Sequence, residues 1–316
     1  MGHVQPFLAL GKADAARAGG KGASLGEMTR VGIPVPPGFV LLSSAFERFL
    51  EETDLNIEID AILESVDAKA LHTVEAASGK IQELILAKEV PEEIRNEALG
   101  GFKELGAEYV AVRSSATAED GASAAWAGQL DTFLNTTEAE LLSNVRKCWA
   151  SLFTPRAIFY RFEKGLESEK ISVAVVVQKM IDSDAAGIAF SVHPVTEDRN
   201  QLIIEAAVGL GEAVVSGQIT PDAYVVTKDP LRILDKNLVE QDRALYRKKG
   251  GGNEWRQLSP EKGREQELSD AQILDLARLV MRIETHYGFP VDVEWALEKG
   301  SLYITQSRPI TTLSAS

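Results

Sequence analysis

Cysteine is almost absent from the sequence: Cys148 is the only one among 316 residues. An intramolecular disulfide is therefore excluded, and we expect a reducing compartment, the cytoplasm. We expect Cys148 to pack in a helix rather than to act as a nucleophile. No apolar run reaches the roughly 18 residues that a membrane span needs, and no basic region precedes a short apolar run at the N-terminus. We therefore expect neither a membrane span nor a signal peptide.

Positive charge is also scarce. The chain has 33 Lys and Arg residues against 47 Asp and Glu residues, which gives a formal net charge of -14 and an isoelectric point near 4.9. This balance opposes binding to nucleic acid or anionic lipid, because both require clustered cations. We expect no nucleic acid or membrane partner. A phosphate ligand would have to be held locally, by a few inward-pointing cations, backbone N–H groups and a metal ion.

The remaining composition is that of a globular protein, with 45% hydrophobic and 25% charged residues. At roughly 150 residues per domain, the length predicts two domains. Hydrophobic periodicity predicts an α+β protein with two lobes that divide near residue 180. The predicted helices cover residues 23–31, 45–52, 57–105 (several helices), 138–162 and 269–287, and the predicted strands cover residues 39–42, 109–113, 171–180, 187–192, 201–206 and 222–227.

Three local features lie outside these elements. We expect Ser43 or Ser44 to cap the helix that follows, because a serine hydroxyl can accept a backbone N–H at a helix N-terminus. Residues 114–128 are small and polar, which predicts either a functional loop or a disordered one. Residues 243–264 are predicted to form an exposed polar excursion.

The segment Val291–Pro309 is the most informative part of the sequence. It alternates on both sides of Lys299–Gly300, which predicts a β-hairpin. Asp292 and Glu294 then share one face of the first strand, and Gln306 and Arg308 share one face of the second. A connecting loop of odd length, such as three residues, would place all four side chains on the same surface.

Two interpretations of this polar surface compete. It could be a solvated outer face that carries an ordinary salt bridge, or it could be a metal and phosphate site. Mg²⁺ commonly takes only one or two protein oxygens beside phosphate oxygens, so Glu294 and the carbonyl oxygen of Gln306 would be enough. Arg308 could offer a bidentate fork to phosphate. We favour the metal and phosphate site.

The hairpin resembles a known family. Asp292–Val293–Glu294–Trp295 followed by Gln306–Ser307–Arg308–Pro309 is similar to the closing segment of the ATP-grasp nucleotide domain of phosphoenolpyruvate synthase, pyruvate phosphate dikinase and rifampin phosphotransferase. The resemblance implies a two-lobed α+β ATP-grasp fold with mixed or antiparallel sheets, in lobes 1–180 and 181–316. It also implies ATP and Mg²⁺ as cofactors, with Glu294 and Gln306 on the metal and Arg308 on phosphate.

Three earlier segments match the same family in the same order. Gly19–Gly26 resembles the opening motif, which implies that Lys21 contacts the nucleotide phosphates. Val112–Asp120 resembles the phosphate loop, which implies the same role for Arg113. Each has a structural alternative, since Gly–Gly–Lys–Gly also forms plain turns and Arg113 could simply pair with an acid of its own loop.

The third segment, Ala127–Thr132, implies that Gly128 and Thr132 lie near the nucleotide. By the same resemblance, residues 116–128 would form a lid over the phosphates. Gln178 ends a predicted strand where the family lines the adenine, so it is the candidate for the adenine edge. It could equally be an ordinary residue at the edge of a sheet.

The resemblance implies a phosphotransferase whose reaction is shared among several domains. Complete enzymes of this family transfer the β-phosphoryl group of ATP to a histidine on a swivelling domain, and then to a small acceptor such as pyruvate. Lys21, Arg113 and Arg308 would be the catalytic cations. The four histidines, His3, His72, His193 and His286, all lie outside the glycine- and threonine-rich loop that presents the carrier histidine.

The carrier histidine and the acceptor site are therefore expected on another chain or on a further part of this one. We expect an ATP-binding domain, or a subunit, of a phosphoenolpyruvate synthase-like dikinase. Two alternatives stay open at this point. One is the ATP-binding domain of a rifampin phosphotransferase, and the other is a non-catalytic ATP-sensing module.

Overall fold

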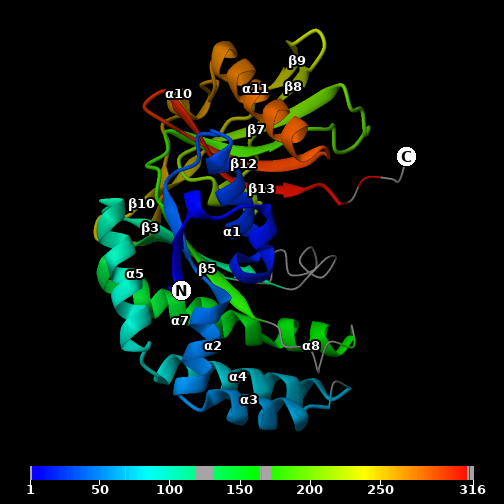
Figure 1. The fold of residues 1–316 in the computed structure, drawn as a ribbon. Helices are drawn as coiled ribbons and strands as arrows, with labels where there is room; N and C mark the ends of the chain where they lie inside the picture. Colours follow the sequence, from blue (N-terminus) through cyan, green and yellow to red (C-terminus); the bar gives the residue numbers. More distant parts are fainter. Residues whose placement is uncertain are drawn as a thin grey trace. The chain divides into compact units, whose positions relative to one another are not determined.

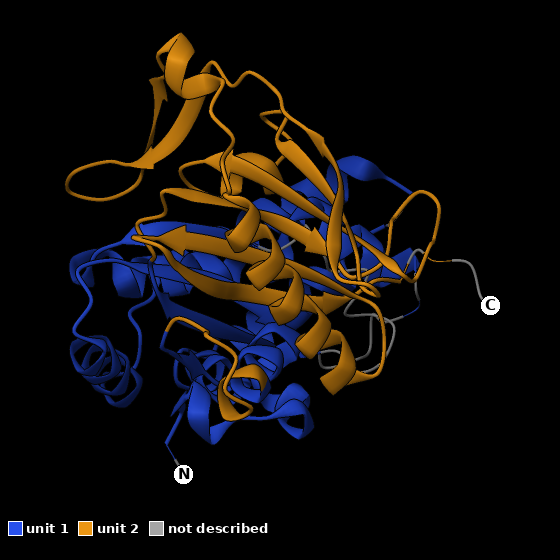
Figure 2. Ribbon diagram, turned by 90° about the horizontal axis from the view of Figure 1, so that it is seen from above, with its two compact units in different colours: residues 1–27, 37–180 blue, residues 28–36, 181–316 orange. Residues whose placement is uncertain are grey.

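The chain forms two compact units, and one short segment from the N-terminal part of the sequence belongs to the C-terminal unit. The computed structural model describes residues 2–67, 69–117, 131–163, 165, 172–311 and 313. Unit 1 contains residues 1–27 and 37–180, and unit 2 contains residues 28–36 and 181–316 (Figure 2). These units differ from the predicted lobes in residues 28–36, which the sequence prediction assigned to the N-terminal lobe.

Unit 1 is built on a five-stranded sheet in which each strand pairs antiparallel with its neighbours. The order is β1-β2-β5-β3-β4, so β5 is inserted between two strands that precede it in the chain. β5 is almost entirely apolar, as the β-branched run 171–180 predicted for a buried strand. The strands are β1 (Val4–Pro6), β2 (Gly38–Leu41), β3 (Val110–Ala116), β4 (Thr132–Thr136) and β5 (Val173–Lys179).

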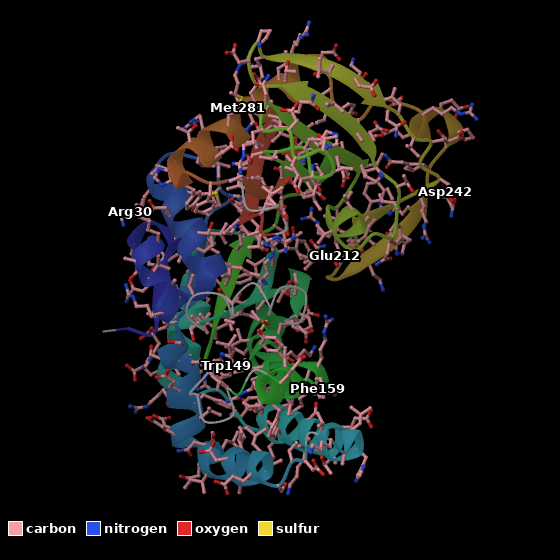
Figure 3. The ribbon with its side chains drawn as sticks, turned by 90° about the vertical axis from the view of Figure 1, so that its right-hand side faces the viewer. Arg30, Trp149, Phe159, Glu212, Asp242 and Met281 are labelled. Carbon is pink, nitrogen blue, oxygen red and sulfur yellow. The ribbon has the colours of Figure 1, made fainter. Side chains whose placement is uncertain are left out.

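Helices cover one face of this sheet (Figure 1). Trp149 is at the centre of the core that they form, where its ring lies 4.8 Å from that of Phe49 and 5.7 Å from that of Phe46 (Figure 3). Cys148 is buried beside it, and burial raises the pKa of its thiol to about 12. It therefore stays a protonated packing residue, as expected. The helices are α2 (Ser43–Glu52), α3 (Leu55–Glu64), α4 (Leu71–Ala87), α5 (Glu92–Leu105), α7 (Leu141–Ala150) and α8 (Pro155–Glu163), with 3₁₀ turns at Phe7–Ala9, Lys12–Asp14, Glu138–Glu140 and Ser151–Phe153.

Unit 2 is built on a six-stranded antiparallel sheet of order β13-β12-β6-β7-β8-β9. The long helix α11 (Asp270–Tyr287) covers one face of it (Figure 1). The Ser269 hydroxyl caps α11 by accepting from Gln272 N, and Gly288 ends the helix in the left-handed conformation. The strands are β6 (Ala185–Phe190), β7 (Gln201–Val208), β8 (Asp222–Thr227), β9 (Arg232–Asn237), β12 (Val291–Glu298) and β13 (Ser301–Pro309), and a short helix, α9 (Glu212–Val215), follows β7.

The segment predicted to be an exposed polar excursion, residues 243–264, is polar and mostly exposed or half-buried, but it contains regular structure that the sequence prediction did not include. This segment contains a second hairpin, β10 (Arg243–Arg247) and β11 (Asn253–Gln257), followed by the short helix α10 (Pro260–Gly263). Its side chains are held by contacts between arginines and aromatic rings: the guanidinium of Arg243 lies 4.4 Å from the centre of the Trp255 ring. Such a hairpin carries no run of alternating apolar residues, so hydrophobic periodicity missed it.

Two further expectations needed correction. Neither Ser43 nor Ser44 caps α2, because Ser43 is already within the helix and the N-cap position is Leu42. The Ser44 hydroxyl instead lies 3.0 Å from His3 Nδ1. The strand predicted at 109–113 continues to Ala116, since Ser114 finds hydrogen-bond partners on the core side.

The α+β class with antiparallel sheets is confirmed. Among the helices that the structure describes, none has the length and the apolar character to cross a membrane.

A buried acidic cluster lies in unit 2, away from the predicted site. Asp222 accepts hydrogen bonds from the Tyr224 hydroxyl (2.9 Å), Val239 N (2.9 Å) and Glu267 N (3.2 Å). The Glu267 side chain is only 2% exposed, and its Oε1 has no hydrogen-bond partner among the described residues. Burial raises the pKa of Glu267 to about 7, with Asp222 adding to the shift and Lys262 opposing it.

Folding should therefore depend on pH through Glu267. In the unfolded chain this carboxyl ionises near its ordinary pKa, whereas the folded protein keeps it protonated to about pH 7. The free energy of unfolding should fall as pH rises from about 4.5 to about 7, by about 1.4 kcal/mol per unit of difference between the two pKa values. Urea unfolding at a series of pH values measures this.

Glu267→Gln should remove this part of the pH dependence, because the amide stays neutral. Exposed Glu240, which pairs with Arg264 at 3.0 Å, provides the control Glu240→Gln, which should follow the wild-type curve. Parallel curves for wild type and Glu267→Gln would contradict the assignment.

Candidate functional site

The register of β12 with β13 places the predicted polar residues opposite one another. Asp292 pairs with Arg308, and Glu294 pairs with Gln306. Directly opposite residues of an antiparallel pair point to the same face of the sheet, with Cβ atoms about 5 Å apart. All four side chains therefore share one surface of unit 2. Val291, Val293, Trp295 and Leu297 lie on the other face and are buried.

The reason for this register differs from the prediction. The turn has two residues, not three: Glu298 pairs with Ser301, while Lys299 (φ 51°) and Gly300 (φ 81°) both adopt positive φ, as a type I′ turn requires. A turn with an even number of residues, in a hairpin without a bulge, would place Glu294 opposite Thr305. A β-bulge makes Thr305 the extra residue of β13, since Trp295 pairs with Ile304 and Glu294 with Gln306. The bulge, rather than the turn, brings the polar residues onto one face.

Asp292 and Arg308 form an ion pair on this face. The Nε–H of Arg308 donates to Asp292 Oδ2 at 2.7 Å. The Asp292 side chain is largely buried, and its Oδ1 has no hydrogen-bond partner among the described residues. The Arg308 side chain is 43% exposed. Because its Nε is directed at Asp292, its terminal NH₂ groups are the ones placed to meet a ligand.

Negative charge gathers beside this pair. Glu205 on β7 pairs with Ile188 on β6, which in turn pairs with Glu294 on β12, so Glu205 and Glu294 lie on the same face with one strand between them. Burial raises the pKa of Glu205, and the charge of Asp292 adds to the shift. Burial likewise raises the pKa of Asp292, while the guanidinium of Arg308 opposes the shift. A cation bound at this face would relieve the repulsion among these carboxylates.

The oxygen atoms of Glu294 and Gln306 suit a hard divalent cation that takes its other ligands from phosphate and water. Glu294 offers carboxylate oxygens, and Gln306, 8% exposed, offers an amide oxygen directly opposite. In the described part of the chain, no three acidic, histidine or cysteine side chains are grouped so that they could hold a metal ion. Two protein oxygens beside phosphate and water oxygens match the way Mg²⁺ is commonly bound.

The predicted phosphate and adenine residues of unit 1 also share one surface. On β3, Val110, Val112 and Ala116 belong to the helical core, so Arg113 and Ser115 lie on the opposite face. β5 alternates in the same way, with Val173, Val175 and Val177 in the core and Gln178 on the opposite face. Arg113 pairs with Val176 and Gln178 with Ala111, so Arg113 and Gln178 are diagonal neighbours on that face.

Thr132 belongs to the same surface. It pairs with Arg113, while its neighbour Phe133 pairs with Val112 and packs against the core. Gly128 and the predicted lid, residues 116–128, fall for the most part outside the described residues, so the expectations for them stay predictions.

Lys21 reaches this surface from α1 (Ala15–Arg30). Its Nζ donates to the carbonyl oxygen of Ser114 at 2.9 Å, and its backbone N donates to the Ser115 hydroxyl at 3.2 Å. A Cβ added to Gly22 would lie 3.1 Å from Val40, which is on the non-core face of β2. The glycine-rich segment therefore packs on the face that carries Arg113. Within unit 1 the structure brings together Lys21, Arg113, Thr132 and Gln178, and within unit 2 it brings together Glu294, Gln306 and Arg308.

Two residues with a direct influence on the predicted cations were not assigned roles from the sequence. Asp292 holds Arg308, and Ser115 holds the backbone beside Lys21. The sequence could have indicated both residues. Residues two apart in a strand lie on the same face, and Asp292 is two residues from Glu294, as Ser115 is from Arg113.

Comparisons with known proteins cover nearly the whole chain. The family described as pyruvate phosphate dikinase, AMP/ATP-binding domain, matches residues 15–316. A probable phosphoenolpyruvate synthase of Methanothermobacter thermautotrophicus is 46% identical over 319 residues, covering 98% of this chain and 46% of that protein. The phosphoenolpyruvate synthase of Pyrococcus furiosus is 40% identical, covering 98% of this chain and 44% of that protein. Rifampicin phosphotransferase of Bacillus subtilis is 40% identical, covering 93% of this chain and 34% of that protein. The chain thus spans less than half the length of these relatives.

The Asp292–Arg308 pair should contribute to stability as well as to the site. Arg308→Ala leaves a buried carboxylate without its cation and should lower the free energy of unfolding by about 1–3 kcal/mol. Adding Asp292→Asn should recover part of this loss, because the unpaired charge is removed. Denaturant titration of the two variants measures both effects.

The matched control is Arg278→Ala, which breaks an exposed pair with Asp275 (2.6 Å) on α11 and should cost less than about 0.5 kcal/mol. If Arg308→Ala were no more destabilising than this control, the Asp292–Arg308 pair would contribute no more to stability than an ordinary exposed ion pair.

Proposed function

This chain belongs to the pyruvate phosphate dikinase AMP/ATP-binding domain family, and we propose that it binds Mg-ATP and donates the β-phosphoryl group to a histidine on another domain or chain. The resemblance inferred from the sequence motifs is thereby confirmed at the level of the family. The observation that carries the proposal for the site is the register of β12 and β13, which aligns Glu294 with Gln306 and Asp292 with Arg308.

We propose nucleotide contacts within each unit, taken by itself. In unit 1, Lys21 and Arg113 would face the phosphates. Thr132 and Gly128 would lie near the nucleotide, and Gln178 would bind the adenine edge. Gln178 is 2% exposed, so a hydrogen bond from its amide to a base would be shielded from water.

In unit 2, Glu294 and Gln306 would hold Mg²⁺, and Arg308 would contact phosphate. The metal would neutralise phosphate charge that the acidic face of unit 2 could not otherwise accept. Arg308 is oriented by Asp292, so its donors are fixed before a phosphate arrives. Fixed cations that require no rearrangement are the main means by which proteins assist phosphoryl transfer.

The reaction that we propose for the longer protein is the formation of phosphoenolpyruvate from pyruvate. In support of this acceptor, three relatives named probable phosphoenolpyruvate synthase are 45–47% identical to this chain. Rifampicin phosphotransferases at 39–40% identity support the second candidate, a rifamycin acceptor. The carrier histidine would lie on the partner domain, and a cytoplasmic location fits a protein whose single cysteine is a buried thiol.

ATP binding is the first test. Calorimetric titration should show micromolar to sub-millimolar affinity that requires Mg²⁺. Lys21→Met and Glu294→Gln should each weaken binding by about tenfold or more, the first by removing a phosphate cation and the second by removing a metal ligand. Lys103→Met, at an exposed lysine 3.8 Å from Glu138, is the control and should leave binding unchanged. No binding at millimolar ATP by the folded chain would contradict the proposal.

Donation of the β-phosphoryl group is a separate test. The chain would be mixed with the histidine-bearing remainder of a phosphoenolpyruvate synthase relative. Label from β-³²P ATP should become bound to that polypeptide in acid-labile form, and label from γ-³²P ATP should appear as free phosphate. Arg308→Ala should slow the transfer by about 10² to 10³. Tight ATP binding without any transfer would instead favour the non-catalytic sensing module.

A further inference from the structure

The helix that carries Lys21 begins at a residue that cannot cap it. Gly19 has φ 67° and ψ 168°, which interrupts α1, so Gly20, Lys21 and Gly22 are the first three residues of the helix that follows. The N–H groups of the first turn have no partner within a helix. In an ordinary helix the side chain of the preceding residue accepts from the second or third of these groups, but Gly19 has no side chain.

Ser115 supplies the missing acceptor from a different element of unit 1. Its hydroxyl oxygen accepts from Lys21 N at 3.2 Å and from Gly22 N at 3.4 Å, which are the second and third N–H groups after Gly19. A Cβ added to Gly19 would lie 2.2 Å from the same hydroxyl oxygen. The hydroxyl of Ser115 therefore occupies the place where the side chain of an ordinary capping residue would be.

In this arrangement the backbone N–H groups of Lys21 and Gly22 are already bonded to Ser115. A helix N-terminus can bind phosphate through the N–H groups of its first turn, but here Ser115 already accepts from two of them. The adjacent carbonyl of Ser114 accepts from Lys21 Nζ at 2.9 Å and draws the side chain onto β3. Arg113 lies two residues before Ser115 on the same face, about 7 Å along the strand. The strand β3 thus positions both residues of unit 1 that are predicted to contact phosphate, Lys21 and Arg113.

We propose that Ser115 is a positioning residue: its hydroxyl caps the Lys21 helix in place of the side chain that Gly19 lacks, and so sets the Lys21 ammonium for the phosphates of a nucleotide. Ser115 itself does not contact the nucleotide. Its neighbour Ser114 has a different role, because the Ser114 hydroxyl faces the core and bonds to Ser151 Oγ (3.0 Å) and to the carbonyl of Asp131 (3.1 Å). This role of Ser115 rests on the proposed function, in which Lys21 contacts the phosphates of ATP.

The cap is tested without nucleotide by amide hydrogen exchange in Ser115→Ala. The N–H groups of Lys21 and Gly22 should exchange about tenfold faster or more than in the wild-type chain, while those of β5 stay unchanged. Ser151→Ala is the matched control, since it removes another buried hydroxyl of unit 1 and should leave both amides protected. Unchanged exchange at Lys21 and Gly22 in Ser115→Ala would overturn the cap.

The positioning role is tested by a double-mutant cycle on ATP affinity with Ser115→Ala and Lys21→Met. Ser115→Ala alone should weaken ATP binding about fivefold or more and leave adenosine binding unchanged. In the Lys21→Met background it should add less than about twofold, because a residue that acts through Lys21 has no effect once Lys21 is gone. Equal effects of Ser115→Ala in both backgrounds would show a merely structural role and overturn the proposal.

The role of Ser115 can still be tested if Ser115→Ala does not fold or if the wild-type chain does not bind ATP. Should Ser115→Ala fail to fold, Ser115→Cys retains the volume with a weaker acceptor and should give intermediate values in both assays. Should the folded wild-type chain bind no ATP, the proposed function and the role of Lys21 would both be contradicted, while the exchange rates would still decide whether Ser115 caps the helix.

Discussion

Burial of alternate side chains along the strands determines which residues each sheet can present to a ligand. In unit 1, Val173, Val175 and Val177 of β5 and Val110, Val112 and Ala116 of β3 are committed to a core with the surrounding helices. Arg113, Ser115 and Gln178 are consequently on the opposite face. In unit 2, α11 covers the face that carries Val293 and Trp295, and the carboxylates of β12 lie on the other. A shift of one residue in either sheet would bury these charges, at a cost of several kcal/mol each.

The two polar surfaces differ in charge, and this difference follows from the neighbours of each cation. In unit 1, the ammonium of Lys21 donates to the carbonyl oxygen of Ser114, a group without net charge. In unit 2, Arg308 is paired with Asp292, and Glu294 and Glu205 lie on the same face as Asp292, so phosphate there would meet net negative charge. A divalent cation between the phosphate and these carboxylates would resolve this conflict, which is why we propose that Glu294 and Gln306 hold a metal ion.

Hydrogen bonds between distant parts of the chain connect the predicted site residues within each unit. Lys21 is tied to Ser114 and Ser115 across more than ninety positions of sequence. On the other sheet, Thr305 is the extra residue that brings Gln306 opposite Glu294. In both cases a residue with no predicted contact to a ligand determines where the predicted ligand contacts lie. Such residues are the ones that a motif search is least able to identify.

The sequence by itself determined the α+β class, the polar hairpin at residues 291–309, the inert role of Cys148 and the family, because each depends on local periodicity, on burial of a strongly apolar segment or on motifs close together in the chain. It also predicted a helix over residues 269–287, where the structure has α11. It did not reveal β10 and β11, because this hairpin carries contacts between arginines and aromatic rings rather than a run of alternating apolar residues. Only the tertiary structure decided the Thr305 bulge, the Asp292–Arg308 pairing and the capping of the Lys21 helix by Ser115. Each of these is a contact between two segments whose alignment is set by the packing of a whole sheet, and no local pattern of residues encodes that alignment.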